Sequence, residues 1–185
     1  MIIAIAITMS VAANAQNEPT RAKHQQGDMA FGGHVSHYME SNFSLTGIGA
    51  RFRYTIMEQM RVEGTFTYFF PKEIVSFGDL LSANISMLNF SVNAHYLFPV
   101  TDRITLYPLV GLGFLGVRTT GTVLGINVQN SDNFATLNIG GGVDIQVADN
   151  ISINIEPKLL RTVSGDNNRD NLGGFVISAG VMFNF

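Results

Sequence analysis

The stretch GGFVISAGVMFNF, residues 173–185, decides the fold because apolar residues recur along it at every second position. One face carries Phe175, Ile177, Ala179, Val181, Phe183 and Phe185, and the other carries Val176, Ser178, Gly180, Met182 and Asn184. A period of two predicts a β-strand with one apolar face. The stretch is also long enough to cross a membrane at a tilt, which takes about nine to eleven residues. We expect Phe175 through Phe185 to face lipid, with Ser178 and Gly180 in the lumen of a barrel.

The same alternation recurs at seven further places in the chain. They are residues 29–37, 43–54, 59–69, 84–98, 103–117, 134–147 and 151–159, of which 29–37 is the least regular. With residues 173–185 they make an even number of strands, as single-chain bacterial barrels have. The sequence therefore predicts an all-β fold, a transmembrane antiparallel up-and-down β-barrel of eight strands with a filled polar lumen.

The connections between these strands fall into two classes. Those near residues 57–58, 99–102 and 148–150 are short, whereas 71–83, 118–132 and 162–172 are long; the first connection, 38–42, is brief. Outer-membrane barrels have short periplasmic turns and longer external loops. We therefore expect both termini at the periplasmic rim and recognition in the three long loops.

Aromatic residues gather near both ends of the predicted strands. Tyr54, Tyr96, Phe98, Tyr107, Phe183 and Phe185 lie near the periplasmic ends, and Tyr38, Phe43, Tyr68, Phe69 and Phe70 lie near the outer ends. Aromatic girdles of this kind mark the two interfaces of a membrane. We expect these rings to form such girdles.

Composition limits the alternatives. Charged residues make up only 14% of the chain, its net charge is -3, and it has no cysteine. Without a basic face, a nucleic-acid partner is not expected. A soluble lipocalin-like carrier also has one apolar face, but its solvent-facing strand positions should be rich in charge. Here those positions are mostly Ser, Thr, Asn and Gly, which favours the membrane barrel.

The N-terminus resembles a secretory signal peptide. Residues 1–13 are apolar, and Ala13-Asn14-Ala15 forms an A-x-A cleavage site ahead of Gln16. No Lys or Arg precedes the apolar run, so either the signal is atypical or translation begins upstream of Met1. We expect a cleaved signal peptide at residues 1–15, a flexible periplasmic lead-in at 16–28, and the barrel at 29–185.

Seven charged residues fall on the lumen face of the predicted strands. They are Arg51, Arg53, Arg61, Glu63, Asp144, Glu156 and Lys158. Because an isolated charge in a low-dielectric interior is costly, we expect them to pair as a lumen charge network that plugs the barrel. The alternative is a gated ion path, since rearranged pairs could admit a column of water.

A family resemblance rests on several short motifs. They are Leu106-Tyr107-Pro108-Leu109-Val110-Gly111-Leu112-Gly113, Gly140-Gly141-Gly142-Val143-Asp144, the turn Ala148-Asp149-Asn150, Glu156, and the terminal Phe185. In these the chain resembles the small outer-membrane barrels that include OmpX and the transmembrane domain of OmpA. The resemblance implies an integral protein of the bacterial outer membrane. It also implies that Phe183 and Phe185 serve as the signal read by the barrel assembly machinery.

Members of that group have roles in adhesion, serum resistance and envelope stability, and the fold does not choose among them. We expect a monomeric, non-enzymatic barrel without cofactor or metal, surrounded by outer-membrane lipids, whose loops have an extracellular ligand. A narrow porin-like channel for very small solutes or ions is the alternative. A lipid-modifying enzyme built on His34 and Ser36, with an acid such as Glu40, is a weaker one.

Overall fold

The computed structural model describes residues 25–40, 43–77, 81–123, 126–163 and 173–185. The strands are β1 (Met29–Glu40), β2 (Phe43–Met57), β3 (Met60–Phe77), β4 (Leu81–Tyr96), β5 (Phe98–Pro99), β6 (Ile104–Val123), β7 (Ile126–Ala148), β8 (Ile151–Thr162) and β9 (Gly173–Asn184). All eight predicted strands are present, and β5 is a two-residue extra that pairs with the start of β6. The expected signal peptide and the lead-in up to residue 24 lie outside the described residues. No helix in the described part of the chain is long and apolar enough to cross a membrane.

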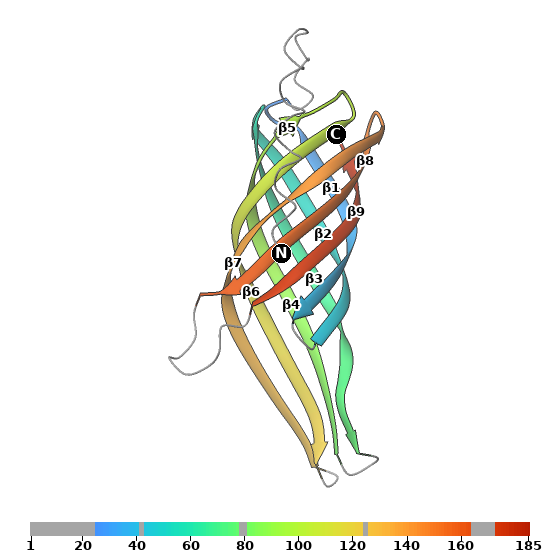
Figure 1. Cartoon of the computed structure of the whole chain (residues 1–185), viewed down its shortest axis with the longest axis vertical. Coiled ribbons are helices and arrows are strands. Elements are labelled where there is room, and N and C mark those ends of the chain that lie inside the picture. The colour runs from blue at the N-terminus through green and yellow to red at the C-terminus, as the bar shows by residue number, and fades with distance from the viewer. Residues whose placement is uncertain (1–24, 41–42, 78–80, 124–125, 164–172) are drawn as a thin grey trace, which may run out of the picture.

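The sheet closes on itself. Each long strand pairs antiparallel with the long strands before and after it in the chain. β4 pairs directly with β6, the next long strand after the short β5, and β1 pairs with β9, which closes the barrel (Figure 1). Tracing paired residues around the barrel from Met29 on β1 leads to Phe175 on β9, which pairs with Met39. One circuit therefore returns to β1 at position 39 and not at position 29, and this offset is the stagger of the barrel. Such a stagger tilts the strands by about 35–45° to the barrel axis. The result is the predicted eight-stranded up-and-down barrel.

The two ends of the barrel differ. At one end Met29 and Phe185 exchange backbone hydrogen bonds, Met29 N to Phe185 O at 3.1 Å and Phe185 N to Met29 O at 2.9 Å. We call this end the terminal rim. At the opposite end, which we call the hairpin rim, the β3–β4 and β6–β7 hairpins reach well beyond the other strands (Figure 1).

The outward face of the barrel carries an apolar belt. In β9 the predicted alternation is confirmed, because Phe175, Ile177, Val181 and Phe183 are 38–50% exposed whereas Ser178 and Met182 are buried. On β6 the outward residues are apolar up to Phe114, which is 65% exposed, and then change to Gly116, Arg118 and Thr120. On β7 they change in the same way after Ala135, to Asn133, Ser131 and Gln129. Since β6 and β7 pair Phe114 with Ala135, the belt ends at one level on both strands.

Two of the three expected long loops are largely strand. Residues 71–77 and 81–83 belong to β3 and β4, and residues 118–123 and 126–132 belong to β6 and β7, paired from Arg118–Ser131 to Val123–Ile126. The expectation of loops was wrong. These segments resemble loops in sequence because they lack the alternation of apolar residues, but a strand that extends beyond the apolar belt does not face lipid and needs no apolar face. Most of the third, from residue 164 to 172, lies outside the described residues. Residues 78–80 and 124–125 do too.

Four of the aromatic residues assigned to girdles point inward. Tyr38, Phe69 and Tyr107 are each 2% exposed, and Phe43 packs against the interior. Tyr54, Tyr68, Phe70, Tyr96, Phe98, Phe183 and Phe185 do lie on the outward face. The girdle prediction was wrong for the first four because nearness to a strand end was given more weight than their place in the alternation.

The interior has an apolar layer near the hairpin rim, which the polar alternation did not predict. It consists of Tyr38, Leu45, Phe69, Met87, Leu115, Leu160 and Val176, with Phe43, Ile85, Val117 and Phe134 packed against it. The first seven come from seven different strands, all of these side chains point into the lumen, and Tyr38 meets Phe69 edge-on at 6.1 Å. The polar part of the lumen lies between this layer and the terminal rim.

An arginine in the apolar belt should destabilise the barrel in lipid. Val110 faces outward and is 53% exposed within the belt, so we expect Val110→Arg to reduce the free energy of unfolding by about 2–4 kcal/mol. Thr120→Arg, on the same strand above the belt, should change it by less than about 1 kcal/mol. Urea unfolding in lipid vesicles measures both. Equal losses in the two variants would contradict the assigned membrane position.

Candidate functional site: the lumen network and the vestibule

All seven predicted lumen charges point into the barrel and are buried. Arg51 and Arg53 come from β2, Arg61 and Glu63 from β3, Asp144 from β7, and Glu156 and Lys158 from β8. Each is at most 6% exposed, and Glu63 and Glu156 are fully buried. The strand alternation brings them inward, and the closure of the barrel brings β2 and β3 opposite β7 and β8.

Arg53 is the centre of one group of ion pairs. Its Nε lies 2.6 Å from Glu63 Oε2, and its Nη1 lies 3.0 Å from Asp144 Oδ1. Arg61 Nη1 contacts the other oxygen of Asp144 at 2.9 Å. Through these contacts Arg53 links carboxylates on opposite walls of the barrel, and Asp144 is held between two guanidinium groups.

Glu156 is the centre of the second group. Its Oε1 accepts a hydrogen bond from Lys158 Nζ at 3.2 Å, and its Oε2 lies 3.5 Å from Arg51 Nη1. Arg51 Nη1 also lies 3.7 Å from Glu63 Oε2, which joins the two groups. Four cationic side chains therefore share three carboxylates, and the network extends across the whole section of the lumen.

Several uncharged residues that were not predicted as site residues complete the network. The Tyr107 hydroxyl accepts from Arg53 Nη2 at 3.1 Å and donates to Glu156 Oε2 at 3.1 Å. The Asn154 amide, turned so that both of its ends are satisfied, accepts from Arg51 Nη1 at 2.6 Å. Both residues lie at inward positions of their strands, so the alternation could have predicted them. They were not predicted because only the charged residues at inward positions were considered.

Two histidines of the network are held by arginines. Arg51 Nε donates to His34 Nδ1 at 3.2 Å, and Arg61 Nε donates to His95 Nδ1 at 3.3 Å. Because a guanidinium can only donate, each Nδ1 must be the acceptor, and a neutral imidazole then carries its hydrogen on Nε2. His34 Nε2 accordingly lies 2.9 Å from Thr67 Oγ1. His95 Nε2 points toward Glu63 Oε1, 3.8 Å away.

Glu63, His95 and Glu156 have ligand atoms within 4.8 Å of one another, as a metal site would require. The chemistry of the set does not fit a cation. The hydrogen on His95 Nε2 occupies the lone pair that a metal would need, and moving it to Nδ1 would set it against the donors of Arg61. Arg51 and Arg53 already supply positive charge beside both carboxylates. The cluster is arranged for hydrogen bonding.

His34 and Ser36 both point into the lumen and do not form a pair. Ser36 Oγ hydrogen bonds to Ser178 Oγ at 2.7 Å, and His34 bonds to Arg51 and Thr67. Glu40 accepts instead from the Tyr38 hydroxyl at 3.0 Å. The three side chains therefore do not assemble the hydrolase arrangement that their sequence spacing allowed, and neither His34 nor Ser36 faces lipid.

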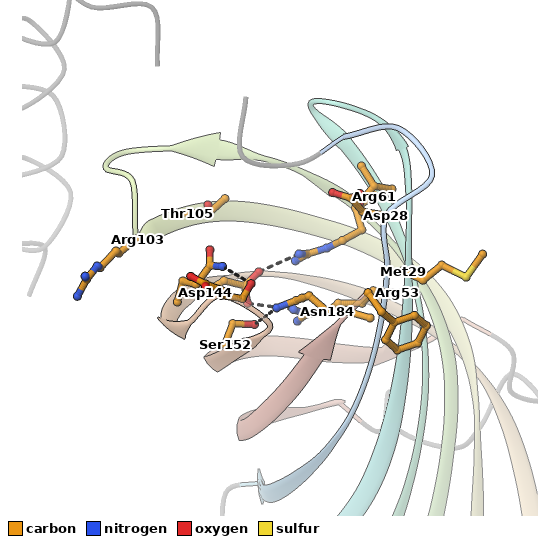
Figure 2. Close-up of a pocket in the computed structure, with 14 residues that line it drawn as sticks. Asp28, Met29, Arg53, Arg61, Arg103, Thr105, Asp144, Ser152 and Asn184 are labelled. Carbon is orange, nitrogen blue, oxygen red and sulfur yellow. Dashed lines mark hydrogen bonds and ion pairs between the residues drawn. The ribbon is translucent and has the colours of Figure 1, made fainter. Parts of the chain in front are cut away.

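A vestibule of about 250 Å³ opens from the lumen at the terminal rim. Arg53, Arg61 and Asp144 converge at its inner end, while Arg103 lies at its mouth and is directed away from them (Figure 2). Its remaining wall combines polar side chains such as Thr55 and Ser152 with apolar ones such as Met29 and Phe185. The vestibule ends at the ion pairs, so its depth is set by the network.

The two terminal aromatics lie on the outward face beside this rim. Phe183 is 50% exposed and Phe185 is 74% exposed, and β9 is paired along both edges. Their use as an assembly signal stays a prediction.

A closed antiparallel barrel with an apolar belt outside and paired charges inside is an integral barrel of the bacterial outer membrane. The chain belongs to the family of the outer membrane protein beta-barrel domain, whose model matches residues 1–185. The terminal rim is therefore the periplasmic side, and the hairpin rim is the outer side. No curated protein matches the sequence at a significant level.

Solved structures of outer-membrane proteins share the fold at low sequence identity. Ail, the attachment invasion locus protein of Yersinia pestis, is 18% identical with a TM-score of 0.58, over 87% of this chain and 100% of that one. The N-terminal barrel of OprF from Pseudomonas aeruginosa is 18% identical with a TM-score of 0.54, over 88% and 100%. OprG from the same organism is 15% identical with a TM-score of 0.51, over 89% and 98%.

Removing Arg53 should strongly destabilise the barrel. Arg53→Met leaves Glu63 and Asp144 as buried carboxylates without this partner, so we expect a loss of about 3–5 kcal/mol in the free energy of unfolding. Arg103→Met, at the exposed mouth of the vestibule, is the matched control and should lose less than about 1 kcal/mol. The midpoint of the heat-induced change in gel migration reports both. A loss at position 53 no larger than that at 103 would show that the network does not stabilise the barrel.

Proposed function

We propose that this protein is a surface-interaction protein that uses the barrel as a membrane anchor and binds partners through the sheet beyond the outer rim. The observation that carries the proposal is the four-stranded sheet formed by the extended ends of β3, β4, β6 and β7. The middle pair, β4 and β6, stays in register out to Leu81–Val123. The sheet therefore projects as one unit beyond the ends of the other strands (Figure 1).

The two edges of this sheet differ. The β3 edge contains Pro71, Lys72 and Glu73, and its pairing with β4 shifts register twice, between Phe69 and Lys72 and between Glu73 and Val75. Proline, charge and bulges are the features by which natural sheets protect an edge from further pairing. The β3 edge is thus blocked against the addition of a strand.

The β7 edge has fewer of these protections. From residue 126 to 134 it contains no proline or lysine, and its pairing with β6 runs without a register shift. Its one charge, Asp132, accepts a hydrogen bond from Asn130 of the same strand at 3.0 Å. β8 reaches only as far as the Thr136–Thr162 pair and the bond from Val163 N to Ala135 O, and no other described strand pairs with this edge.

The hydrogen-bond pattern shows which groups the edge offers. Gln146 N donates to the oxygen of Arg103, the residue before β6, and Val163 N donates to Ala135 O on the opposite side. Since N–H and C=O groups alternate between the two sides of an antiparallel strand, those of Gln129, Ser131 and Asn133 face the open edge. An extended polypeptide can add there as a further strand, a known mode of peptide recognition.

The partner we propose is an extended segment of another polypeptide. Two copies in one membrane are related by rotation about the membrane normal. Where two such barrels face each other, their β7 strands would point the same way along the normal but tilt in opposite directions, so they would cross at about twice the strand tilt. Flat pairing between two copies is therefore unfavourable. The sequence of residues 164–172, SGDNNRDNL, is rich in Gly, Asp and Asn, which have low strand propensity. The interaction role agrees with that of the structural neighbour Ail, named for attachment and invasion.

Blocking the open edge should abolish strand addition. Ser131→Pro removes an outward N–H without removing a bond to β6, and Ser131→Ala keeps that N–H. With a fluorescent peptide of alternating threonine and valine as probe, we expect the wild type and Ser131→Ala to bind equally and Ser131→Pro to bind about three- to tenfold more weakly, as the loss of one backbone hydrogen bond implies. Fluorescence anisotropy measures this. Equal binding by all three proteins would exclude the β7 edge.

A narrow channel is the second candidate, and the vestibule is the observation that favours it. The vestibule ends at the ion pairs of Arg53, Arg61 and Asp144. Between these ion pairs and the hairpin rim lies the apolar layer that contains Leu45 and Leu115. An ion would have to pass both barriers.

We therefore expect no stable conductance from the wild-type protein in planar lipid bilayers at neutral pH. Reproducible nanosiemens-scale openings, with a buffer blank and the Arg53→Met variant as comparisons, would favour the channel instead.

A further inference from the structure

We infer that the lumen network is an acid-sensitive lock, in which uptake of a proton by His95 releases its contact with Arg61 and loosens the inner end of the vestibule. The inference concerns the interior of the barrel and is independent of the proposed role of the outer sheet. It rests on the position of one buried imidazole among the ion pairs.

The neutral form of His95 is required by its hydrogen bonds. Arg61 places Nε at 3.3 Å and Nη2 at 3.1 Å from His95 Nδ1, so both donors point at the same ring nitrogen. A proton on that nitrogen would face them directly, and one or both contacts would be lost. The imidazole is 1% exposed, so water cannot replace them in place.

Every wall of the barrel near this ring carries a group that responds to its charge. On β3 are Arg61 and Glu63, on β2 is Arg53, and on β8 is Glu156. On β6 the Tyr107 ring stacks on the imidazole at 4.5 Å, and on β7 Asp144 holds Arg61. A protonated His95 would be a fifth cation beside three carboxylates.

The structure also offers the protonated ring a new partner. Glu63 Oε1 lies 3.8 Å from His95 Nε2, and it has no hydrogen-bond partner among the described residues. A cationic imidazole would move toward this oxygen and away from Arg61. Arg61 would then keep Asp144 and the face of the Tyr107 ring, at the wall of the vestibule that is open to the periplasm.

The effect should stop at the apolar layer. None of the side chains in that layer gains charge in acid, because its one titratable residue, Tyr38, is neutral at and below pH 7. Acid should therefore admit solvent from the periplasmic side as far as the network without opening a path through the barrel.

The test compares the wild type with His95→Gln as full-length barrels in lipid nanodiscs between pH 7 and pH 4. A glutamine at this position can accept from Arg61 and donate to Glu63, but it cannot bind a proton in this range. A histidine ring that has left Arg61 takes up a proton below its ordinary pKa of about 6.5, whereas the intact network requires the neutral ring. Every state in which this contact is released, the unfolded chain included, is therefore favoured as pH falls. Each pH unit below that value should favour unfolding of the wild type over the variant by up to about tenfold.

His37→Gln is the matched control. His37 lies on the outward face of β1, where its Nδ1 bonds to Thr46 Oγ1 at 3.0 Å, and its replacement should leave the pH profile of the wild type unchanged. Identical profiles for the wild type and His95→Gln would overturn the inference.

Two further measurements are made on the wild type, so the test does not depend on the variant folding. Imidazole ¹⁵N NMR at pH 7 should show His95 neutral with hydrogen on Nε2, and a doubly protonated ring or the opposite tautomer would refute the lock. On acidification, amide protection factors, which allow for the slower intrinsic exchange in acid, should fall for β3 and β4 near Arg61 and His95 while those of β6 near Leu115 stay high. Uniform loss of protection along β6 would also count against it.

Discussion

In the membrane every backbone N–H and C=O group of this chain must find its partner within the protein, because lipid offers none. Closure of the sheet between β1 and β9 satisfies this requirement, and the rest of the structure depends on it. The return of the pairing from Met29 to Met39 sets the tilt, and a barrel of this size has an interior wide enough only for side chains. Inward residues on opposite walls are therefore forced into contact.

That confinement explains the chemistry of the lumen. Arg53 reaches both Glu63 and Asp144 only because β2, β3 and β7 surround the same narrow space. Charges buried there would be costly alone, and their ion pairs and the Tyr107 hydroxyl offset that cost. The same crowding gives His95 a tautomer fixed by Arg61, which turns a structural network into one that can respond to acid.

Outside the lipid the requirement changes, and so does the design of the strands. Beyond Phe114 and Ala135 the outward residues become polar while the β6–β7 pairing continues. Water can satisfy an open edge there, so β7 can leave the groups of Gln129, Ser131 and Asn133 unpaired by any described strand. The barrel in the membrane and the proposed binding edge are thus parts of the same continuous strands on either side of one boundary.

The sequence by itself determined the membrane-crossing part of the barrel. In a strand that faces lipid on one side, the apolar alternation is obligatory, and residues Phe175 through Phe183 show it plainly. The residues between the apolar ones must then face the lumen, which is how the sequence predicts the inward charges. Above the belt no such pattern is required, and the Asn-, Thr- and Gly-rich ends of β6 and β7 resembled loops for that reason. Nor could the sequence show that Tyr38 and Phe69 close the lumen with apolar rings, or that Arg61 would meet His95. Those contacts join residues from different strands around the barrel, and only its closure and stagger decide which of them come within reach.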